Sequence, residues 1–384
     1  MYETETNCII LALEQGPRLR ASVEFSLHLH QYGKYRRMQH RTIKIYLTTL
    51  TLAAIGTAGA AVIHVPADQP TIQQGIDAAS NGDTVAVAAG TYFERLDFHG
   101  KAIALRSESG PSRTVIDGSN AGTVITFQGG ERRNSKVIGF SIEHGNASFG
   151  AGMMLLGASP TIMRNTFRHN AQGGGGFGAA IGGNGSSPVI ENNTFVGNTC
   201  DTQFLSGVVS FVNSSAPVII NNVFSSNPCR AINMTLPEGN TPVVANNTIV
   251  RNSVGVRVDA RVPTSSQLYA NNIIVQNDMG LQVDFLNPGN EPTWENNLVF
   301  ANPSGDYVGI ANLTGTNGNI SVDPEFVGPG GRDLDLSPGS PAIDAGTLDV
   351  PNLPAKDFAR NPRVLDGDGN GEALPDMGAF EFVP

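Results

Sequence analysis

Short runs of alternating apolar and polar residues recur along the chain at a nearly constant interval. The segments TPVVANNTIVRN (241–252), SQLYANNIIVQN (266–277) and EPTWENNLVFAN (291–302) begin 25 residues apart. Each contains a pair of asparagines in the same place. The second residue of this pair recurs at intervals of 28, 29, 25, 25 and 25 residues, as Asn165, Asn193, Asn222, Asn247, Asn272 and Asn297.

Three further positions keep their chemical character in every unit. Positions are counted here from the second asparagine of each pair. Three residues before it the chain is apolar, with Ile162, Ile190, Ile219, Val244, Tyr269 and Trp294. Two residues after it the chain is again apolar, with Phe167, Phe195, Phe224, Ile249, Ile274 and Val299. Five residues after it stand Asn170, Asn198, Asn227, Asn252, Asn277 and Asn302. A period in this range is typical of coils that stack, with like residues above like.

The pattern within each unit predicts strands rather than helices. Apolar and polar residues alternate over short runs, which is the period of a strand. About 25 residues leave room for three short strands and their turns, whereas a propeller blade needs about 40 and a leucine-rich repeat needs regularly spaced leucines. We therefore expect an all-β fold, a right-handed parallel β-helix in which each coil pairs only with its neighbours.

The recurring asparagines have a structural explanation. Asparagine tolerates the left-handed conformation that a tight corner requires. Stacked about 4.8 Å apart, equivalent amide side chains also form hydrogen bonds from coil to coil. We expect these residues to hold the coils together rather than to catalyse a reaction.

The segment 63–107, IHVPADQPTIQQGIDAASNGDTVAVAAGTYFERLDFHGKAIALRS, resembles the opening of the pectate-lyase-like superfamily of single-stranded right-handed β-helices. The resemblance implies that residues 71–79 form a helix that caps the open end of the core, and that residues 82–92 form the first strand. The local residues agree, because Thr71 is a good N-cap and Asn81-Gly82 suits the end of a helix. This fold hosts many activities, so the resemblance does not assign one.

Cys200 and Cys229 are separated by the same interval as Asn198 and Asn227. They should therefore occupy equivalent positions in adjacent coils, at a spacing that a disulfide accommodates. The sequence leaves two possibilities, a disulfide or two buried thiols.

Residues 1–60 differ from the rest of the chain. Residues 38–60 have a basic start, an apolar stretch and an Ala-x-Ala site, the layout of a secretory signal peptide. We expect residues 1–37 to be an upstream extension, residues 61–327 to form the β-helix and residues 328–384 a C-terminal module. The expected mature chain is exported and has no integral membrane segment, since no later stretch is long and apolar enough.

The charge balance narrows the class of partners. The chain has 24 basic and 34 acidic residues, and removing residues 1–60 leaves 17 basic and 30 acidic residues, a net charge of −13. An acidic surface disfavours nucleic acid and anionic lipid, and it is compatible with glycans and divalent cations.

One strand pair offers candidate catalytic residues. The segments GVRVDAR (255–261) and GLQVDFL (280–286) align, so Asp259 and Asp284 should stack in neighbouring coils with Arg257 nearby. Two carboxylates beside an arginine can hold Ca²⁺ and a uronic acid, as the resemblance to pectate lyases implies, or act as an acid/base pair. The alternative is a set of ordinary polar residues on a solvent-facing strand. His144 and His169 are 25 residues apart and should also stack, as a two-histidine site or as turn residues.

Residues 328–384 lack the repeat and resemble the C-terminal module of bacterial exported and surface β-helix proteins. Within them Asp366, Asp368 and Asn370 lie at alternate positions before Gly371, the first half of a calcium-loop pattern. Met377 stands where that pattern has a glutamate, and Asp376 is the expected substitute. We expect a structural Ca²⁺ here that closes the C-terminal end of the solenoid, with a plain acidic turn as the alternative.

Three functional hypotheses follow. The first is a secreted, calcium-stabilised β-helix that binds, or is displayed among, extracellular polysaccharides without turning them over. The second is a polysaccharide lyase or glycoside hydrolase that acts on an acidic glycan through Arg257, Asp259 and Asp284. The third is an adhesin-like structural protein of the cell surface.

Overall fold

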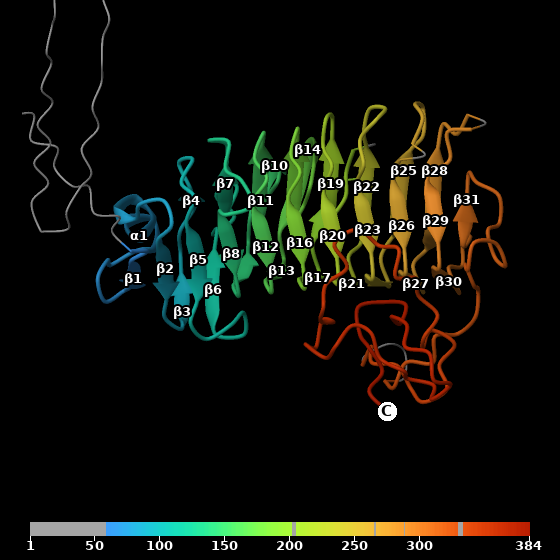
Figure 1. Cartoon of the computed structure of the whole chain (residues 1–384). Helices are drawn as coiled ribbons and strands as arrows, with labels where there is room; N and C mark the ends of the chain where they lie inside the picture. Colours follow the sequence, from blue (N-terminus) through green and yellow to red (C-terminus); the bar gives the residue numbers. More distant parts are fainter. Residues whose placement is uncertain (1–58, 202–204, 265, 288, 329–332) are drawn as a thin grey trace, which may run out of the picture. The chain divides into compact units, whose positions relative to one another are not determined.

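The computed structural model describes residues 59–384, except residues 202–204, 265, 288 and 329–332, and Figure 1 shows its coils stacked side by side. The predicted upstream extension and nearly all of the predicted signal peptide lie outside the described residues. The described residues from 59 to 384 form one compact unit built on three long parallel sheets. The predicted all-β parallel β-helix is confirmed, with about one coil for each strand of the first, ten-stranded sheet.

From β2 onward each coil contributes one strand to each long sheet, and β1 adds a tenth strand to the first sheet. The first sheet consists, in spatial order, of β1 (Val62–Val65), β2 (Thr84–Val87), β5 (Ala104–Ser107), β8 (Lys136–Ile138), β12 (Thr161–Met163), β16 (Val189–Glu191), β20 (Val218–Ile220), β23 (Val243–Ala245), β26 (Leu268–Ala270) and β29 (Thr293–Glu295). The second consists of β3 (Gly90–Tyr92), β6 (Thr114–Asp117), β9 (Ser141–Glu143), β13 (Thr166–Arg168), β17 (Thr194–Val196), β21 (Val223–Ser225), β24 (Thr248–Val250), β27 (Ile273–Val275) and β30 (Leu298–Phe300). The third consists of β4 (Leu96–Asp97), β7 (Ile125–Phe127), β11 (Met153–Leu156), β15 (Ile181–Asn184), β19 (Val209–Val212), β22 (Arg230–Thr235), β25 (Val254–Asp259), β28 (Met279–Asp284) and β31 (Tyr307–Val308). A small additional sheet consists of β10 (Asn146–Phe149), β14 (Ala171–Phe177) and β18 (Thr199–Cys200).

The register places like residues above like, as the spacing predicts. Tyr269 pairs with Trp294 across β26 and β29, and their rings stack with centroids 4.3 Å apart. Phe167, Phe195 and Phe224 form another column, with successive centroids 5.1 and 4.5 Å apart. These columns are buried in one continuous core. The core therefore follows directly from the period of the sequence.

The N-terminal cap is a short helix, as expected. Helix α1 (Ile72–Ala78) begins after Thr71, whose side-chain oxygen accepts a hydrogen bond from the backbone N–H of Gln74. Its buried residues include Gly75, where a Cβ atom would lie 2.9 Å from a Val85 methyl group, so only glycine allows the helix to approach the sheet this closely.

Two details of this region differ from the prediction. The helix ends at Ala78, with Ala79 as its C-cap, rather than at Asn81-Gly82. The segment 82–92 is not one first strand. It forms β2 and β3, which belong to different sheets, and β1 precedes both. The chain turns a corner at residues 88–89, so the apolar run serves two sides of the coil.

The two asparagines of each pair divide the two predicted roles between them. The first residue of the pair takes the left-handed conformation, with φ of 56° at Asn192, 57° at Asn221, 49° at Asn246, 55° at Asn271 and 49° at Asn296. The second is buried and forms the ladder: Asn222 Nδ2, for example, donates to Asn247 Oδ1 at 3.0 Å, and Asn247 Nδ2 donates to Asn272 Oδ1 at 3.0 Å. The asparagines five residues after each pair, such as Asn227, Asn252 and Asn277, form a second ladder in the same way.

Both ladders extend one step beyond the repeat. Asn319 accepts from Asn297 Nδ2 at 3.0 Å, although it is only 22 residues further on. Asp306 accepts from Asn302 Nδ2 at 2.7 Å. A carboxylate suits this last place because it only has to accept hydrogen bonds there.

The C-terminal module lies along the side of the last coils rather than across their open end (Figure 1). Its apolar residues Leu336, Ile343 and Met377 pack on outward-facing residues of the second sheet, such as Val250 and Ile273. The open end of the main core is instead contacted by Tyr307, Ile310 and Leu313. The expected closure of the solenoid end by residues 328–384 is therefore replaced by lateral docking, because the outer faces of these coils are apolar.

The corner asparagines hold the module in place. Asn221 Nδ2 donates to the Lys356 carbonyl at 2.8 Å, and Asn246 Nδ2 donates to the Asp376 carbonyl at 3.1 Å. Asn271 both donates to the Thr347 carbonyl and accepts from the Thr347 N–H. The side chains that point outward at the corner thus provide the hydrogen bonds on which the module docks.

Within the part of the chain that the structure describes, no helix is long and apolar enough to cross a membrane.

Candidate functional site

Arg257 lies on the outer face of the third sheet and is fully buried there. Val256 and Val258 point into the core, so ordinary strand alternation directs Arg257 outward. Its Nε donates to Asp284 Oδ2 at 2.9 Å, and its Nη1 donates to Thr235 Oγ1 at 2.9 Å and to Asn233 Oδ1 at 3.2 Å. The guanidinium group therefore joins three successive strands, β22, β25 and β28, from the outside.

The two predicted carboxylates do stack in neighbouring coils, since Asp259 pairs with Asp284 in the register of β25 and β28. Both are paired with arginine, and Arg257 lies 4.0 Å from Asp259 as well. Asp284 binds Arg257, while Arg261 Nε donates to both oxygens of Asp259 at 3.0 Å. The alternative hypothesis was that these are ordinary polar residues on a solvent-facing strand. It does not hold for Arg257 or Asp259, since Arg257 is fully buried and Asp259 is only 4% exposed. The three predicted catalytic residues form an ion-pair network in which Arg257 and Asp259 are buried and the Asp284 side chain is 26% exposed.

A hollow of about 210 Å³ opens beside this network on the same face. Arg230 and Gln282 supply its longest polar side chains, and Pro228 and Met279 supply apolar surface. Gln282 connects the hollow to the network, because its Nε2 donates to Asp284 Oδ1 at 3.0 Å. The register explains the grouping, since Gln282 pairs with Arg257 and Arg230 pairs with Val254.

The hollow carries charges of both signs, since Arg230 and Asp201 both belong to its lining. Partial burial lowers the pKa of Arg230, and the positive charge of Arg257 lowers it further, while Asp284 opposes both effects. Arginine remains protonated in proteins even so. Arg230 also donates from Nη1 to the Ser206 carbonyl at 3.3 Å, which holds its side chain in place beside the hollow.

The rim of the hollow is held by a disulfide. The structure joins Cys200 and Cys229, with Cα atoms 5.8 Å apart, on adjacent coils as their spacing predicts. Both cysteines line the hollow. The sequence indicated the cysteines and the Arg257–Gln282 match, but it did not indicate that Arg230 shares a cavity with them.

The C-terminal module contains a second group of functional candidates. Asp366 and Asp368 lie together as the loop pattern predicts, and Asp344 joins them, with one carboxylate oxygen of each residue within 4.8 Å of the others. Asp366 Oδ1 is buried and has no hydrogen-bond partner among the described residues. Three converging carboxylates with such an oxygen suit a hard cation such as Ca²⁺. Asp344 was not predicted, because it precedes the loop and lies outside its pattern.

Asp376, another predicted ligand, does not belong to this group of carboxylates, and Asn370 contacts the group through Asp368. Asn370 Nδ2 donates to Asp368 Oδ2 at 2.9 Å, and its Oδ1 accepts from the Glu372 N–H. The carboxylate of Asp376 instead accepts from the backbone N–H groups of Asp344 and Phe382. Burial raises the pKa of Asp376 to about 6. Asp376 is thus part of the interior of the module. Asp344 takes the place beside Asp366 and Asp368 that we predicted for Asp376.

Arg363 forms the centre of that interior. It is buried, donates from Nη2 to Asn221 Oδ1 at 2.7 Å and to the Ala379 carbonyl at 3.0 Å, and forms an ion pair with Glu381. Burial raises the pKa of Glu381 to about 8, although Arg363 acts in the opposite direction. This arginine therefore links the folded module to the corner of a coil.

Comparison with known proteins agrees with the fold. The family model described as "Right handed beta helix region" matches residues 74–236. The chain folds as a right-handed parallel β-helix. Among solved structures it is similar to one titled "Crystal structure of pectate lyase Pel9A", with 15% identity, a TM-score of 0.44, and coverage of 85% of this chain and 98% of that chain. No curated protein sequence matches the chain.

Proposed function

We propose that this right-handed β-helix is an exported protein that binds acidic extracellular polysaccharide. The observation that supports this most directly is the hollow on the third sheet, where Arg230 and Gln282 lie beside the Arg257–Asp284 pair. At about 210 Å³ it is smaller than a typical small-molecule pocket of about 300–1,000 Å³, so it suits one sugar unit of a chain. An arginine fork is well matched to the carboxylate of a uronic acid.

Export is proposed from the sequence of residues 38–60 and agrees with a disulfide between Cys200 and Cys229, which persists in oxidising compartments. Residence in the medium or at the cell surface follows from the same proposal.

Binding is favoured over turnover by the arrangement of the predicted catalytic residues. Arg257 has no exposed surface, and the carboxylates of Asp259 and Asp284 are each held by an arginine. An acid/base pair needs carboxylates that reach the substrate and exchange protons with it. In this network they hold the strands together and shape the edge of the hollow.

Replacing Arg230 by alanine is expected to weaken binding of polygalacturonate by about tenfold or more, because a charge-assisted hydrogen bond contributes about 1.5–3 kcal/mol. Affinity electrophoresis with polygalacturonate, and with a neutral galactan as the comparison polymer, measures this. Arg106→Ala is the matched control, since Arg106 is an exposed arginine of β5. Unchanged retention of polygalacturonate by Arg230→Ala would rule out this hollow as the binding site.

The same samples test turnover. Release of unsaturated or reducing ends by the wild type, lost in Asp284→Ala, would establish the lyase or hydrolase in place of the binding protein. Retention without release supports binding.

We further propose that Ca²⁺ binds Asp344, Asp366 and Asp368 and stabilises the C-terminal module. Removal of calcium with a chelator is expected to lower the melting temperature, since a ligand at 100 times its Kd stabilises the folded state by about 2.7 kcal/mol. The chelator should have no such effect on Asp368→Asn. Asp349→Asn changes an exposed carboxylate of the same module and should behave like the wild type. Equal melting curves with and without calcium in the wild type would contradict the proposal.

A further inference from the structure

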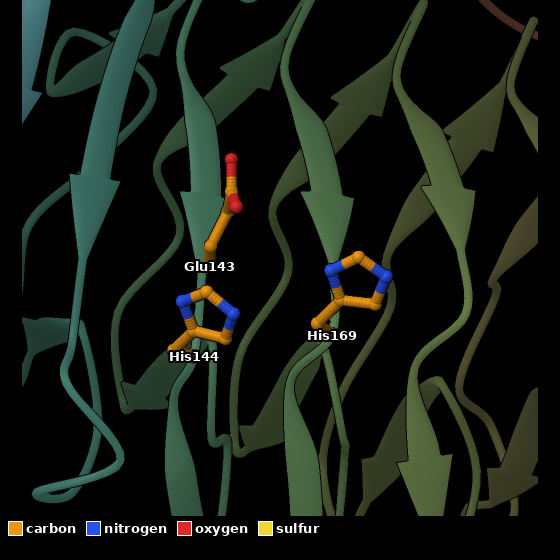
Figure 2. Close-up of side chains that lie close together, drawn as sticks. All are labelled: Glu143, His144 and His169. Carbon is orange, nitrogen blue, oxygen red and sulfur yellow. The ribbon is translucent and has the colours of Figure 1, made fainter.

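A second cluster of potential metal ligands lies at the outer edge of the second sheet. It contains Glu143, His144 and His169, each with one ligand atom within 4.8 Å of the others. Figure 2 shows Glu143 and His144 on one coil and His169 on the next, with a ring nitrogen of each histidine facing the other. The rings are nearly parallel, with centroids 6.0 Å apart and an interplanar angle of 15°.

The fold accounts for the position of these histidines but not for their chemistry. Both occupy the corner after a strand of the second sheet, with φ of 52° at His144 and 56° at His169. The equivalent corners of the following coils hold Gly197, Ser226 and Arg251, also at positive φ. The corner therefore accepts several residue types, and nothing in its geometry requires two adjacent imidazoles.

A carboxylate orients the first imidazole. Asp117 Oδ2 lies 2.9 Å from His144 Nδ1, and the Asp117 side chain is only 13% exposed. With the Nδ1 proton held by this carboxylate, Nε2 carries the lone pair, and it is the nitrogen that faces His169 in Figure 2. A carboxylate bound to the far nitrogen of a histidine is the usual support of a metal ligand.

Glu143 supplies an oxygen ligand from a fixed position. It is 6% exposed, and Arg168 on the neighbouring strand pairs with its Oε1 at 2.6 Å. A metal ion would take the other oxygen, Oε2, so the ion pair orients the carboxylate and also opposes the cation by its charge.

From this geometry we propose that Glu143, His144 and His169 form a binding site for a divalent transition-metal ion of the Zn²⁺ class. Two imidazole nitrogens and one carboxylate oxygen suit Zn²⁺, Co²⁺, Ni²⁺ or Cu²⁺, whereas Ca²⁺ and Mg²⁺ prefer oxygen alone. At metal–ligand distances of about 2.0–2.1 Å, tetrahedral ligands lie about 3.3 Å apart, so small side-chain rotations close the site. Three protein ligands leave a coordination position for water.

Metal titration of the full chain tests this site. The protein is stripped with a chelator, returned to buffer with excess Ca²⁺ so that the acidic loop is occupied, and titrated with ZnCl₂ in a calorimeter. The wild type should show one saturable site, and Co²⁺ should give the visible absorption of a nitrogen-ligated ion. His144→Asn and His169→Asn should each weaken binding by roughly tenfold or more, since each removes a ligand while asparagine tolerates the corner conformation.

His99 provides the matched control. It also lies at a positive-φ corner, φ 52°, with Asp97 Oδ1 3.4 Å from its Nδ1, and it belongs to neither cluster of potential metal ligands found in the described residues. His99→Asn should therefore leave zinc binding unchanged. Arg168→Ala should strengthen binding, because it removes a positive charge beside the ion, and a purely structural role for the cluster does not predict this gain.

Two results would overturn the proposal. One is a wild type that binds no Zn²⁺ and gives no Co²⁺ spectrum, which requires no variant to fold. The other is zinc binding that survives both His144→Asn and His169→Asn but is lost in Asp368→Asn, which would place the ion in the acidic loop.

Discussion

Replacing Asn247 by leucine is expected to lower the free energy of unfolding by about 3–5 kcal/mol, although the two side chains are similar in size. The Asn247 amide is fully buried in the middle of its ladder. Its Nδ2 donates to the Ile219 carbonyl at 2.9 Å and to Asn272 Oδ1 at 3.0 Å. Its Oδ1 accepts from the backbone N–H and from Nδ2 of Asn222, both at 3.0 Å.

Leucine offers none of these groups, so several buried partners lose their hydrogen bonds at once. Each unsatisfied buried group costs about 1–3 kcal/mol. The gain in apolar surface does not offset this loss, because the position is already buried and packed.

Urea denaturation followed by circular dichroism gives the overall loss, and hydrogen exchange locates it. Exchange should accelerate first at the backbone amide of Asn222 and in the adjacent strands, since coils depend mainly on their neighbours. Asn134→Leu is the control, because Asn134 is exposed in a turn, and its effect should stay within about 0.5 kcal/mol. A similarly small effect of Asn247→Leu would mean that the ladder does not stabilise the coils.

Replacing Arg363 by methionine is expected to release the C-terminal module from the coils, at a cost of about 3–5 kcal/mol. Methionine fills much of the space but leaves Glu381 buried without its cation. It also removes the hydrogen bond to Asn221 Oδ1, 142 residues earlier in the chain. The module has no helix or long strand of its own among its described residues, so this buried network holds much of its structure.

The pH dependence follows from the raised pKa of Glu381, about 8 in the folded wild type. Without Arg363 that pKa rises further, because the guanidinium group no longer favours the charged form. The folded variant then retains a proton that the unfolded chain has lost, so its stability continues to fall as pH rises above about 8. The deficit relative to wild type should therefore widen in alkaline solution.

Limited proteolysis with detection of fragments from residues 333–384 measures the release. Adding Glu381→Gln to Arg363→Met should recover part of the stability, because glutamine is neutral without taking up a proton and can still accept from the Asp376 N–H. A double variant no more stable than the single one would show that the ion pair is not what anchors the module.

The contacts between adjacent coils could be predicted because the period alone fixes them. Once the coils repeat at a constant interval, Tyr269 must lie above Trp294 and Asp259 above Asp284, whatever surrounds them. The same constant interval correctly predicted that Cys200 lies beside Cys229 and His144 beside His169. It did not predict Asn319 and Asp306, because they continue the two ladders after shorter intervals.

The environment of the outward-facing residues could not be predicted in this way. Alternation shows that Arg257 points away from the core, but solvent and a buried ion-pair network are equally compatible with that direction. The network depends on Asn233 and Thr235 from the previous coil, which carry no recognisable motif. Asp344 joins the acidic loop for a similar reason, since its place depends on how the module folds back rather than on spacing within the loop.

The sequence by itself determined the β-helix, its core columns and the neighbours of each residue along the stack, because a parallel solenoid converts a fixed sequence interval into a fixed distance. Only the tertiary structure decided what covers each outer face. The Asn221 side chain donates a hydrogen bond to the carbonyl of Lys356, which is 135 residues further along the sequence, and no periodic pattern encodes a contact of that separation. Whether a polar side chain binds a partner, a metal or its own chain depends on such contacts, so the site required the structure and the fold did not.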